Sequence, residues 1–351
     1  MKKLSFLIGS LGGGGAERVT IELGDYFCKK GYEVYFIVFS KSNNNYKINS
    51  NIKLEYLPES TGDKVSILYR IKELKRILKS QNPEYVFSLG LGYQYLLIGN
   101  LLNKYKFILS ERNAPQYFYK WYERCYVKYC YKKAYKVVFQ TKEAQEYFGN
   151  VIYKKSKVIA NPITKLLPEL FLGERENRIV AVNRLSQQKN IFMLFRAFKR
   201  VLEKYPEYIL EIYGKGEQKL ELEEYAKKLR INTKVFFKGQ KENVHNYIIN
   251  AKMFVSSSDF EGMSNSMLEA MAIGLPVVCT DCPIGGARMV IEDKVNGLLT
   301  PVNDDKKFAE AIIYLIENPE LARNIGLRAS ELRQELDPDK IAKQWEELLH
   351  L

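Results

Sequence analysis

Two glutamates, Glu261 and Glu269, flank the stretch of this sequence that is best placed to do chemistry. The residues from Asn265 to Ile273 favour a helix, and Ser264 or Asn265 stands where its N-cap belongs. Free backbone N–H groups at a helix N-terminus form a ready-made anion site. One carboxylate is then expected at the mouth of the loop and the other about two turns along the helix. The pattern predicts an anion pocket flanked by two acids.

A strand, a loop and a helix must position these acids. Lys252–Ser257 is expected to form a short buried strand that leads into the polar turn at Glu261. Gly274 ends the helix, Pro276 prevents it from resuming, and Val277 begins the next strand. Taken alone, two acids eight residues apart are equally compatible with an ordinary strand–loop–helix unit whose glutamates are solvated.

The residues around these two acids distinguish an anion pocket from an ordinary strand–loop–helix unit. Gly262 and Asn265 between the two acids, Gly274-Leu-Pro-Val behind them and Asn296-Gly-Leu-Leu further on resemble the signature of the family 4 retaining glycosyltransferases. These enzymes have the GT-B fold, so the resemblance implies an α/β protein with two Rossmann-like domains facing across a cleft. Residues 1–165 would be the acceptor-binding domain and 166–337 the donor-binding domain, with a helix at 338–351 packing back on the first.

The rest of the chain alternates strands and helices, as a parallel sheet covered on both faces requires. Expected strands begin near Lys3, Glu33, Ile52, Tyr85, Lys106 and Ser156, and after a linker at 162–178 near Ile179, Tyr208 and Val235. The glycine-rich loop at 12–15 follows the first strand. Alone it indicates either a tight turn or a close backbone approach to a ligand.

Arg184 and Lys189 lie five residues apart on a loop after a predicted strand, a spacing suited to clamping a diphosphate with two cations, although solvated loop charges would look the same. Within the resemblance they match the family's diphosphate-binding cations. The resemblance also implies that Glu261 contacts the donor sugar and Glu269 the ribose. The other donor contacts that it implies are Gly13, Gly14, Glu17, Gly214, Gly216, Asn243, Val244, Gly262, Met263, Ser264, Asn265 and Arg288.

One position departs from the family pattern. Many members carry a histidine after the fifth N-terminal strand, whereas this chain has Ser110-Glu111-Arg112-Asn113 there. Arg112 or Asn113 is expected in that role. An arginine cannot be a general base near pH 7, but it can stabilise a leaving phosphate. The expected catalytic groups are therefore Glu261, Arg184, Lys189 and Arg112.

Composition limits the remaining possibilities. The 351 residues suit two domains, and 46% hydrophobic with 27% charged residues are typical of a globular protein. No apolar run reaches the roughly 20 residues of a membrane span. The five cysteines are expected to be free thiols, and with two histidines no metal site and no cofactor are expected.

Positive charge is concentrated in the first half of the chain. Residues 1–160 hold 27 of the 54 Lys and Arg but only 13 of the 41 Asp and Glu, a balance of +14, which leaves −1 for the remainder. A basic half-molecule implies a polyanionic partner: nucleic acid, an anionic membrane surface or an acidic substrate.

Aromatic and basic residues alternate between Gln116 and Val138, where a helix is expected. Such a helix can lie at a membrane interface, stack on single-stranded nucleic acid, or simply pack its apolar side into its own domain. The membrane or lipid-linked acceptor is the partner expected here, with no nucleic acid. The residues expected to make this contact are Lys120, Trp121, Arg124, Lys128, Lys132 and Lys133.

Together these features predict a metal-independent, retaining hexosyltransferase that uses a nucleotide diphosphate sugar, expected to be UDP-linked. The acceptor is expected to be a glycan on polyprenyl diphosphate, and the protein a cytoplasmic one, peripheral at the inner face of the plasma membrane. Asp281 to Arg288 resembles members that build bacterial capsule or O-antigen repeats. The alternative is a nucleotide-sugar isomerase of the 2-epimerase type, which shares the fold.

Overall fold

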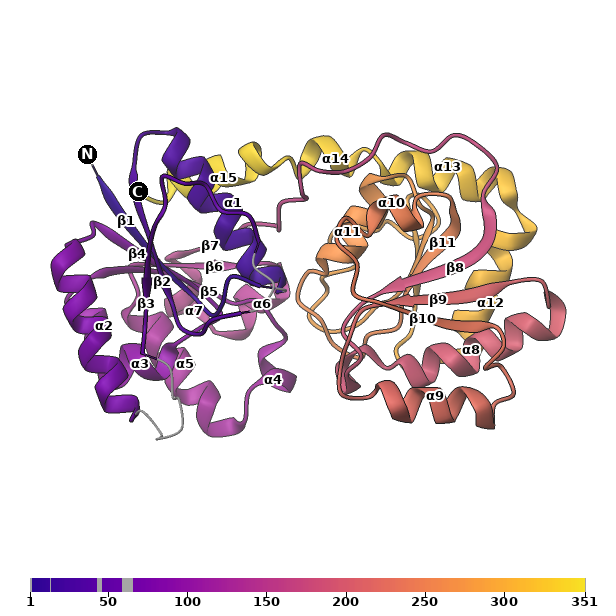
Figure 1. The fold of residues 1–351 in the computed structure, drawn as a ribbon, viewed down its shortest axis with the longest axis horizontal. Coiled ribbons are helices and arrows are strands. Elements are labelled where there is room, and N and C mark those ends of the chain that lie inside the picture. The colour runs from indigo at the N-terminus through magenta and orange to yellow at the C-terminus, as the bar shows by residue number, and fades with distance from the viewer. Residues whose placement is uncertain (1, 13, 43–45, 59–65, 351) are drawn as a thin grey trace. The chain divides into compact units, whose positions relative to one another are not determined.

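The computed structural model describes residues 2–12, 14–42, 46–58 and 66–350, and the chain divides into two compact units (Figure 1). The first unit contains Met1–Pro162 and Pro338–Leu351, and the second contains Ile163–Asp337. The chain therefore passes from one unit to the other twice. The first crossing lies three residues before the position expected from the sequence, and the second lies where it was expected.

The described part of the first unit is built on a parallel sheet of seven strands in the order β3-β2-β1-β4-β5-β6-β7. Figure 1 shows α1 and α15 together on one side of this sheet and α2, α3 and α5 on the other. The strands are β1 (Lys3–Ile8), β2 (Glu33–Val38), β3 (Lys53–Tyr56), β4 (Tyr85–Leu89), β5 (Lys106–Ser110), β6 (Lys136–Phe139) and β7 (Ser156–Val158). The helices are α1 (Gly15–Lys29), α2 (Ile67–Gln81), α3 (Tyr93–Ile98), η1 (Leu101–Asn103), α4 (Pro115–Phe118), α5 (Trp121–Lys133), α6 (Lys142–Tyr147), α7 (Asn150–Tyr153) and α15 (Pro338–Glu347).

The C-terminal helix α15 is part of the core of the first unit. Trp345 is fully buried, and its ring centroid lies 6.2 Å from that of Phe87 in β4. The hydroxyl of Tyr26 donates a hydrogen bond to Glu346 Oε2 at 2.8 Å, and that of Tyr85 donates to the Leu349 carbonyl oxygen at 2.8 Å. The segment after residue 337 therefore completes the hydrophobic core of the first unit.

The second unit has a parallel sheet of six strands among its described residues, in the order β10-β9-β8-β11-β12-β13. Apolar residues of α8, α12 and the sheet, Phe195, Phe198 and Phe308 among them, form its core. The strands are β8 (Glu176–Val182), β9 (Ile209–Tyr213), β10 (Val235–Gly239), β11 (Ala251–Ser256), β12 (Val277–Thr280) and β13 (Leu298–Thr300). The helices are η2 (Gln187–Lys189), α8 (Ile191–Lys204), α9 (Lys219–Lys228), α10 (His245–Ile248), α11 (Asn265–Ala272), α12 (Asp305–Glu317), α13 (Pro319–Ala329) and α14 (Leu332–Glu335).

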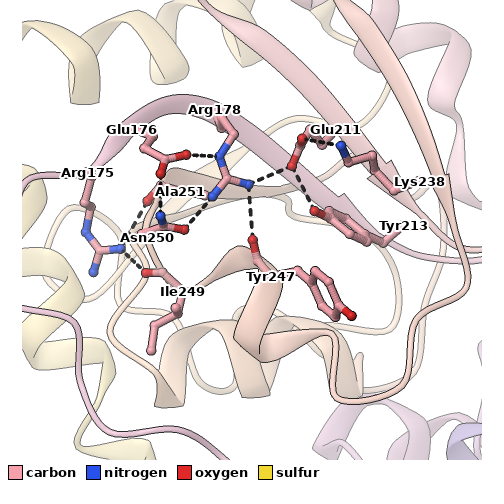
Figure 2. A network of polar contacts seen from close by, with 10 residues as sticks. All are labelled: Arg175, Glu176, Arg178, Glu211, Tyr213, Lys238, Tyr247, Ile249, Asn250 and Ala251. Atoms are coloured by element: carbon pink, nitrogen blue, oxygen red, sulfur yellow. Dashed lines mark hydrogen bonds and ion pairs between the residues drawn. The ribbon is translucent and has the colours of Figure 1, made fainter.

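Strand β8 begins three residues earlier than the sequence predicts, inside the segment expected to be a linker. Figure 2 shows why charged residues are accommodated there. Arg178 donates hydrogen bonds to Glu211 Oε2 at 2.7 Å and to the Tyr247 carbonyl oxygen at 3.1 Å, and it also pairs with Glu176. Glu211 is only 5% exposed and accepts further hydrogen bonds from Lys238 and Tyr213. The charged residues Glu176 and Arg178 of the predicted linker are therefore neutralised within the sheet.

No helix of the described segments is both long enough and apolar enough to cross a membrane.

Replacing Arg178 by alanine should destabilise the second unit by about 2 kcal/mol, because the buried Glu211 carboxylate loses one of its two cations and keeps only Lys238 and Tyr213 as partners. A calorimetric melting curve measures this as a lower transition temperature. The exposed Arg200, which pairs with Asp305 across 2.8 Å, is the matched control. Arg200→Ala should lower the transition temperature much less, because an exposed ion pair contributes little to stability. Equal effects of the two substitutions would contradict the importance of the buried network.

Candidate active site

In the second unit, the loops that carry the predicted donor residues meet at one point of the sheet. Strands β8 and β11 are neighbours. The strands that follow β8 in the chain lie on one side of this pair, and those that follow β11 lie on the other, so the order of the strands reverses here. In open parallel sheets, ligands bind outside the carboxyl ends of the strands at such a reversal. The loop after β8 carries Lys189, and the loop after β11 carries Glu261. The topology therefore places both predicted loops at the position where this type of sheet binds ligands.

Hydrogen bonds fasten the two loops to each other. Gln188 Nε2 donates to the Phe260 carbonyl oxygen at 2.9 Å, and the Asp259 backbone N–H donates to the Gln188 carbonyl oxygen at 2.9 Å. Ser257 Oγ donates to the Lys189 carbonyl oxygen at 2.8 Å. These contacts join two segments about 70 residues apart in sequence into one surface.

Lys189 and Glu261 form an ion pair on this surface. Lys189 Nζ donates to Glu261 Oε2, and Ser258 Oγ donates to the same oxygen at 3.2 Å. The side chains are 14% and 20% exposed, so the pair is partly buried but reachable from solvent. An ammonium group held beside a carboxylate can present a cation to a phosphate and an acceptor to a hydroxyl within one small area.

Helix α11 begins directly after this pair. Ser264 is its N-cap, and its side chain accepts a hydrogen bond from the Met267 N–H, as the sequence predicts. Gly262 and Met263 are buried, and Asn265 is the first helical residue. The backbone N–H of Glu261 donates to the Pro283 carbonyl oxygen, so the amides relevant to an anion are those further along the turn. The predicted loop and the predicted helix N-terminus are thus adjacent.

Glu269 lies within α11 and is 4% exposed. Its Oε2 lies 2.8 Å from Nε2 of His245, the first residue of α10. A charge this deeply buried requires a polar partner, and the histidine supplies one.

The Gly214-Lys-Gly216 segment lies against the end of β8. A Cβ atom at Gly214 would lie 1.8 Å from the Asn183 carbonyl oxygen, and one at Gly216 would lie 2.1 Å from that of Leu185. Any larger residue would push this loop away from the one that leads to Lys189. Glycine is needed at both positions because two backbone segments lie very close together there.

The remaining predicted donor residues of this unit are Arg184, Arg288, Asn243 and Val244. Arg184 is exposed, and among the described residues its side chain makes no hydrogen bond or ion pair. Arg288 pairs with Asp281 across 2.6 Å. Asn243 is exposed with a φ of 47°, and Val244 is the N-cap of α10.

In the first unit, the loop after β1 is also at a reversal of strand order, between β1 and β4. Gly14 is the N-cap of α1, and a Cβ atom there would lie 1.7 Å from Glu17 Oε2. The Glu17 carboxylate thus lies directly over the loop backbone. Gly13 lies outside the described residues.

Glu111 follows β5 and is held by four donors. Its Oε1 accepts from the backbone N–H groups of Arg112 at 2.9 Å and Asn113 at 3.1 Å, and from the Tyr119 hydroxyl at 3.3 Å. Its Oε2 accepts from the Tyr131 hydroxyl at 3.0 Å. The carboxyl group is 2% exposed, and burial raises its pKa to about 7. Glu111 therefore fixes the turn that carries Arg112.

The Arg112 guanidinium lies 5.6 Å over the Trp345 ring, and Nη1 donates to Asn161 Oδ1 at 2.5 Å. Its Nε and Nη2 atoms are buried without a hydrogen-bond partner in the described part of the chain. Burial lowers the pKa of Arg112 to about 10, so the group remains a cation at neutral pH. Two unsatisfied donors on a buried cation are suited to an anionic ligand.

The aromatic and basic segment forms helix α5, and its two sides differ. Val127, Cys130 and Tyr131 are buried against the domain. Trp121 is 72% exposed, and Tyr129 is also exposed. The packing of α5 into its own unit thus leaves these aromatic rings in solvent. Lys120, Lys128, Lys132 and Lys133 are exposed as well, and Arg124 is half-buried.

Two family models match the chain: "Glycosyltransferase Family 4" over residues 13–164 and "Glycosyl transferases group 1" over residues 163–332. The chain belongs to the family 4 glycosyltransferases. One relative is the amylovoran biosynthesis glycosyltransferase AmsD of Erwinia amylovora, 25% identical over 100% of both chains. Another is a 4-alpha-N-acetylgalactosaminyltransferase of Campylobacter jejuni, named for a diphospho-undecaprenol-linked substrate, 28% identical over 98% of both chains.

Solved structures agree with this glycosyltransferase fold. The sucrose-phosphate synthase of Thermosynechococcus elongatus superposes with a TM-score of 0.83 at 18% identity, covering 99% of this chain and 98% of that one. HepE of Anabaena, in complex with UDP and glucose, superposes with a TM-score of 0.82 at 19% identity over 100% of both chains. The GT-B fold class that the sequence predicts is confirmed.

The sequence pattern misses two residues that hold predicted site residues in place. It assigns no role to His245, although this residue directly follows Asn243-Val244 and contacts Glu269. Glu111 was treated only as a neighbour of Arg112. Nothing in the local pattern marks a buried carboxyl group, since its four donors come from a turn, from Tyr119 directly after α4 and from Tyr131 in α5.

Glu111 predicts a pH dependence of stability. Because its folded pKa of about 7 lies above the ordinary value of 4.5, unfolding releases its proton between pH 4.5 and 7 and stability falls as pH rises through this window. Glu111→Gln should remove this fall, so the variant gains roughly 3 kcal/mol relative to wild type from pH 4.5 to 7. Melting temperatures at several pH values measure the difference.

The exposed Glu146→Gln is the matched control and should follow the wild-type pH dependence. A constant difference between Glu111→Gln and wild type across this pH range would contradict the raised pKa.

Proposed function

We propose that this glycosyltransferase moves a hexose from a UDP-linked donor to a glycan on polyprenyl diphosphate, with retention at the anomeric carbon, in bacterial surface polysaccharide synthesis. The observation that carries the donor part is the Lys189–Glu261 ion pair at the strand reversal, next to the start of α11. The cation fits the diphosphate of the donor, and the carboxylate fits the hydroxyl groups of its sugar.

The chemistry follows from charge. Breaking the bond from the sugar to the diphosphate leaves negative charge on the departing phosphate. Lys189, Arg184 and the amides at the start of α11 would stabilise that charge electrostatically. Glu261 would accept hydrogen bonds from the sugar hydroxyls, and Glu269 from the ribose. Because protein cations can do this work, we propose that no metal and no cofactor are required.

Arg112 is proposed as the cation of the first unit that contacts an anionic part of a substrate, because two of its donors are buried without partners among the described residues. Gly13, Gly14 and Glu17 are proposed to approach the donor from the same unit, and Gly214, Gly216, Asn243, Val244 and Arg288 from the other.

The acceptor and pathway rest on the relatives. The Campylobacter enzyme is named for an undecaprenyl-linked substrate and AmsD for amylovoran biosynthesis. The basic first unit is compatible with a diphosphate-linked acceptor at an anionic membrane. We propose that the exposed side of α5 lies at the inner face of the plasma membrane, with aromatic rings at headgroup level and lysines near anionic lipid.

Lys189→Ala and Arg184→Ala should each weaken UDP binding by roughly 10- to 100-fold, since each removes a charge-assisted contact with the diphosphate. Isothermal titration calorimetry measures the affinity. Lys199→Ala, which removes an exposed lysine from α8, is the control and should bind UDP as wild type does.

Sugar transfer should persist in EDTA, because the proposed mechanism uses protein cations and no metal ion. Failure of wild type to bind any nucleoside diphosphate would refute the donor site, and loss of transfer in EDTA would refute metal independence.

Removing Lys128, Lys132 and Lys133 together should abolish most binding to vesicles that contain anionic lipid, because each lysine near such a surface contributes about 1 kcal/mol. Vesicle co-sedimentation measures this. The control removes Lys219, Lys227 and Lys228 from α9, an equal charge change on another exposed helix. Equal loss in both variants would contradict a specific role for α5, and retention on single-stranded DNA but not on vesicles would favour nucleic acid.

A further inference from the structure

His245 has no place in the mechanism described so far, although it contacts Glu269. Both side chains are buried, at 9% and 6% exposure, and 2.8 Å separates His245 Nε2 from Glu269 Oε2. The two residues come from different helices, α10 and α11. The contact therefore joins the loop after β10 to the helix that follows the Lys189–Glu261 pair.

The surroundings of Glu269 explain why it needs such a partner. Its neighbours on α11, Met267, Leu268, Ala270 and Met271, are all buried and apolar. A carboxylate among apolar side chains is free to turn unless a donor fixes one of its oxygens. A carboxylate oxygen accepts hydrogen bonds, and His245 Nε2 is the ring atom that faces it. The ring thereby fixes the direction of Oε2.

The second ring nitrogen adds an independent observation. Nδ1 of His245 is buried and has no hydrogen-bond partner in the described part of the chain. A buried polar atom without a partner destabilises its surroundings unless a ligand or water satisfies it. His245 also directly follows Val244, one of the residues predicted to lie beside the base. A ring with one nitrogen engaged and one unsatisfied fits the wall of a ligand pocket better than a closed core.

We propose that His245 is a positioning residue that holds the carboxylate of Glu269 toward the ribose hydroxyls and so sets the preference for ribonucleotides over deoxyribonucleotides. This inference rests on the proposed function, in which Glu269 contacts the ribose of a UDP-linked donor. His245 contacts Glu269 and takes no direct part in the transfer. Its loss would let the carboxylate turn away, so that the ribose hydroxyls lose their acceptor while the diphosphate contacts remain.

The test compares binding of UDP, 2′-deoxy-UDP and 3′-deoxy-UDP by calorimetry. Wild type should prefer UDP by about 10-fold or more, the effect of losing a hydrogen bond to a charged group. His245→Ala should bind the three ligands nearly equally, with its affinity for the deoxynucleotides unchanged. His245→Gln places a donor near the position of Nε2 and should restore the preference, whereas His245→Asn places it near Nδ1 and should not. The exposed Asn246→Ala on the same short helix is the control and should behave as wild type.

The outcomes separate two failures. If wild type binds no UDP, the proposed donor is refuted, and this inference with it. If wild type binds UDP but His245→Ala keeps the full ribose preference, His245 is a structural residue and the inference alone is refuted. A lower melting temperature with unchanged preference leads to the same conclusion. If the alanine variant does not fold, the glutamine and asparagine variants decide, because equal preference in both would refute the role of Nε2.

Discussion

Burial of charge is the constraint on which much of this protein depends. Parallel sheets are covered on both faces, so an ionisable side chain on or beside a strand has little access to water. Glu211, Glu111 and Glu269 are all nearly inaccessible. Each has its own kind of compensation: two cations and a hydroxyl for Glu211, four hydrogen-bond donors for Glu111, and an imidazole for Glu269.

The three kinds of compensation have different consequences. The network around Glu211 includes full positive charges and stabilises the sheet. Burial raises the pKa of Glu111 to about 7, and its hydrogen-bond donors oppose this only in part. The imidazole beside Glu269 engages one of its carboxylate oxygens. Glu261, which is partly exposed, instead combines a cation with access to solvent. The degree of burial thus distinguishes a carboxylate that supports the fold from one that can meet a substrate.

Much of the fold could be predicted from the sequence, because hydrophobic periodicity and turn residues are local signals. The strand, loop and helix around Glu261 and the strands from Lys3 to Ser110 follow from them, to within a few residues at their ends. The start of β8 could not be predicted, since its charges are matched by residues 33 and 72 positions away. The candidate site was predictable as a set of residue types. Its pairs were not, because Lys189 and Glu261 meet only after the sheet has brought their loops together.

The same limit applies to the first unit. The Arg112 turn could be located by its place after the fifth strand, but of the tyrosines that hold Glu111 one directly follows α4 and the other lies in α5. Sequence spacing gives no measure of a contact between elements that fold onto one another late. Predictions were therefore strongest where one motif contained all its own partners, and weakest where a side chain depended on a distant one.

Helix α15 also has a consequence for biosynthesis. Trp345 occupies the core of the first unit, although it follows the whole of the second unit in the chain. A ribosome makes the chain from its N-terminus, so the second unit has its full sequence before the first unit does. The earlier domain must wait with part of its apolar core uncovered until translation reaches residues 338–349. The order in which the domains are completed is thus the reverse of the order in which they are begun.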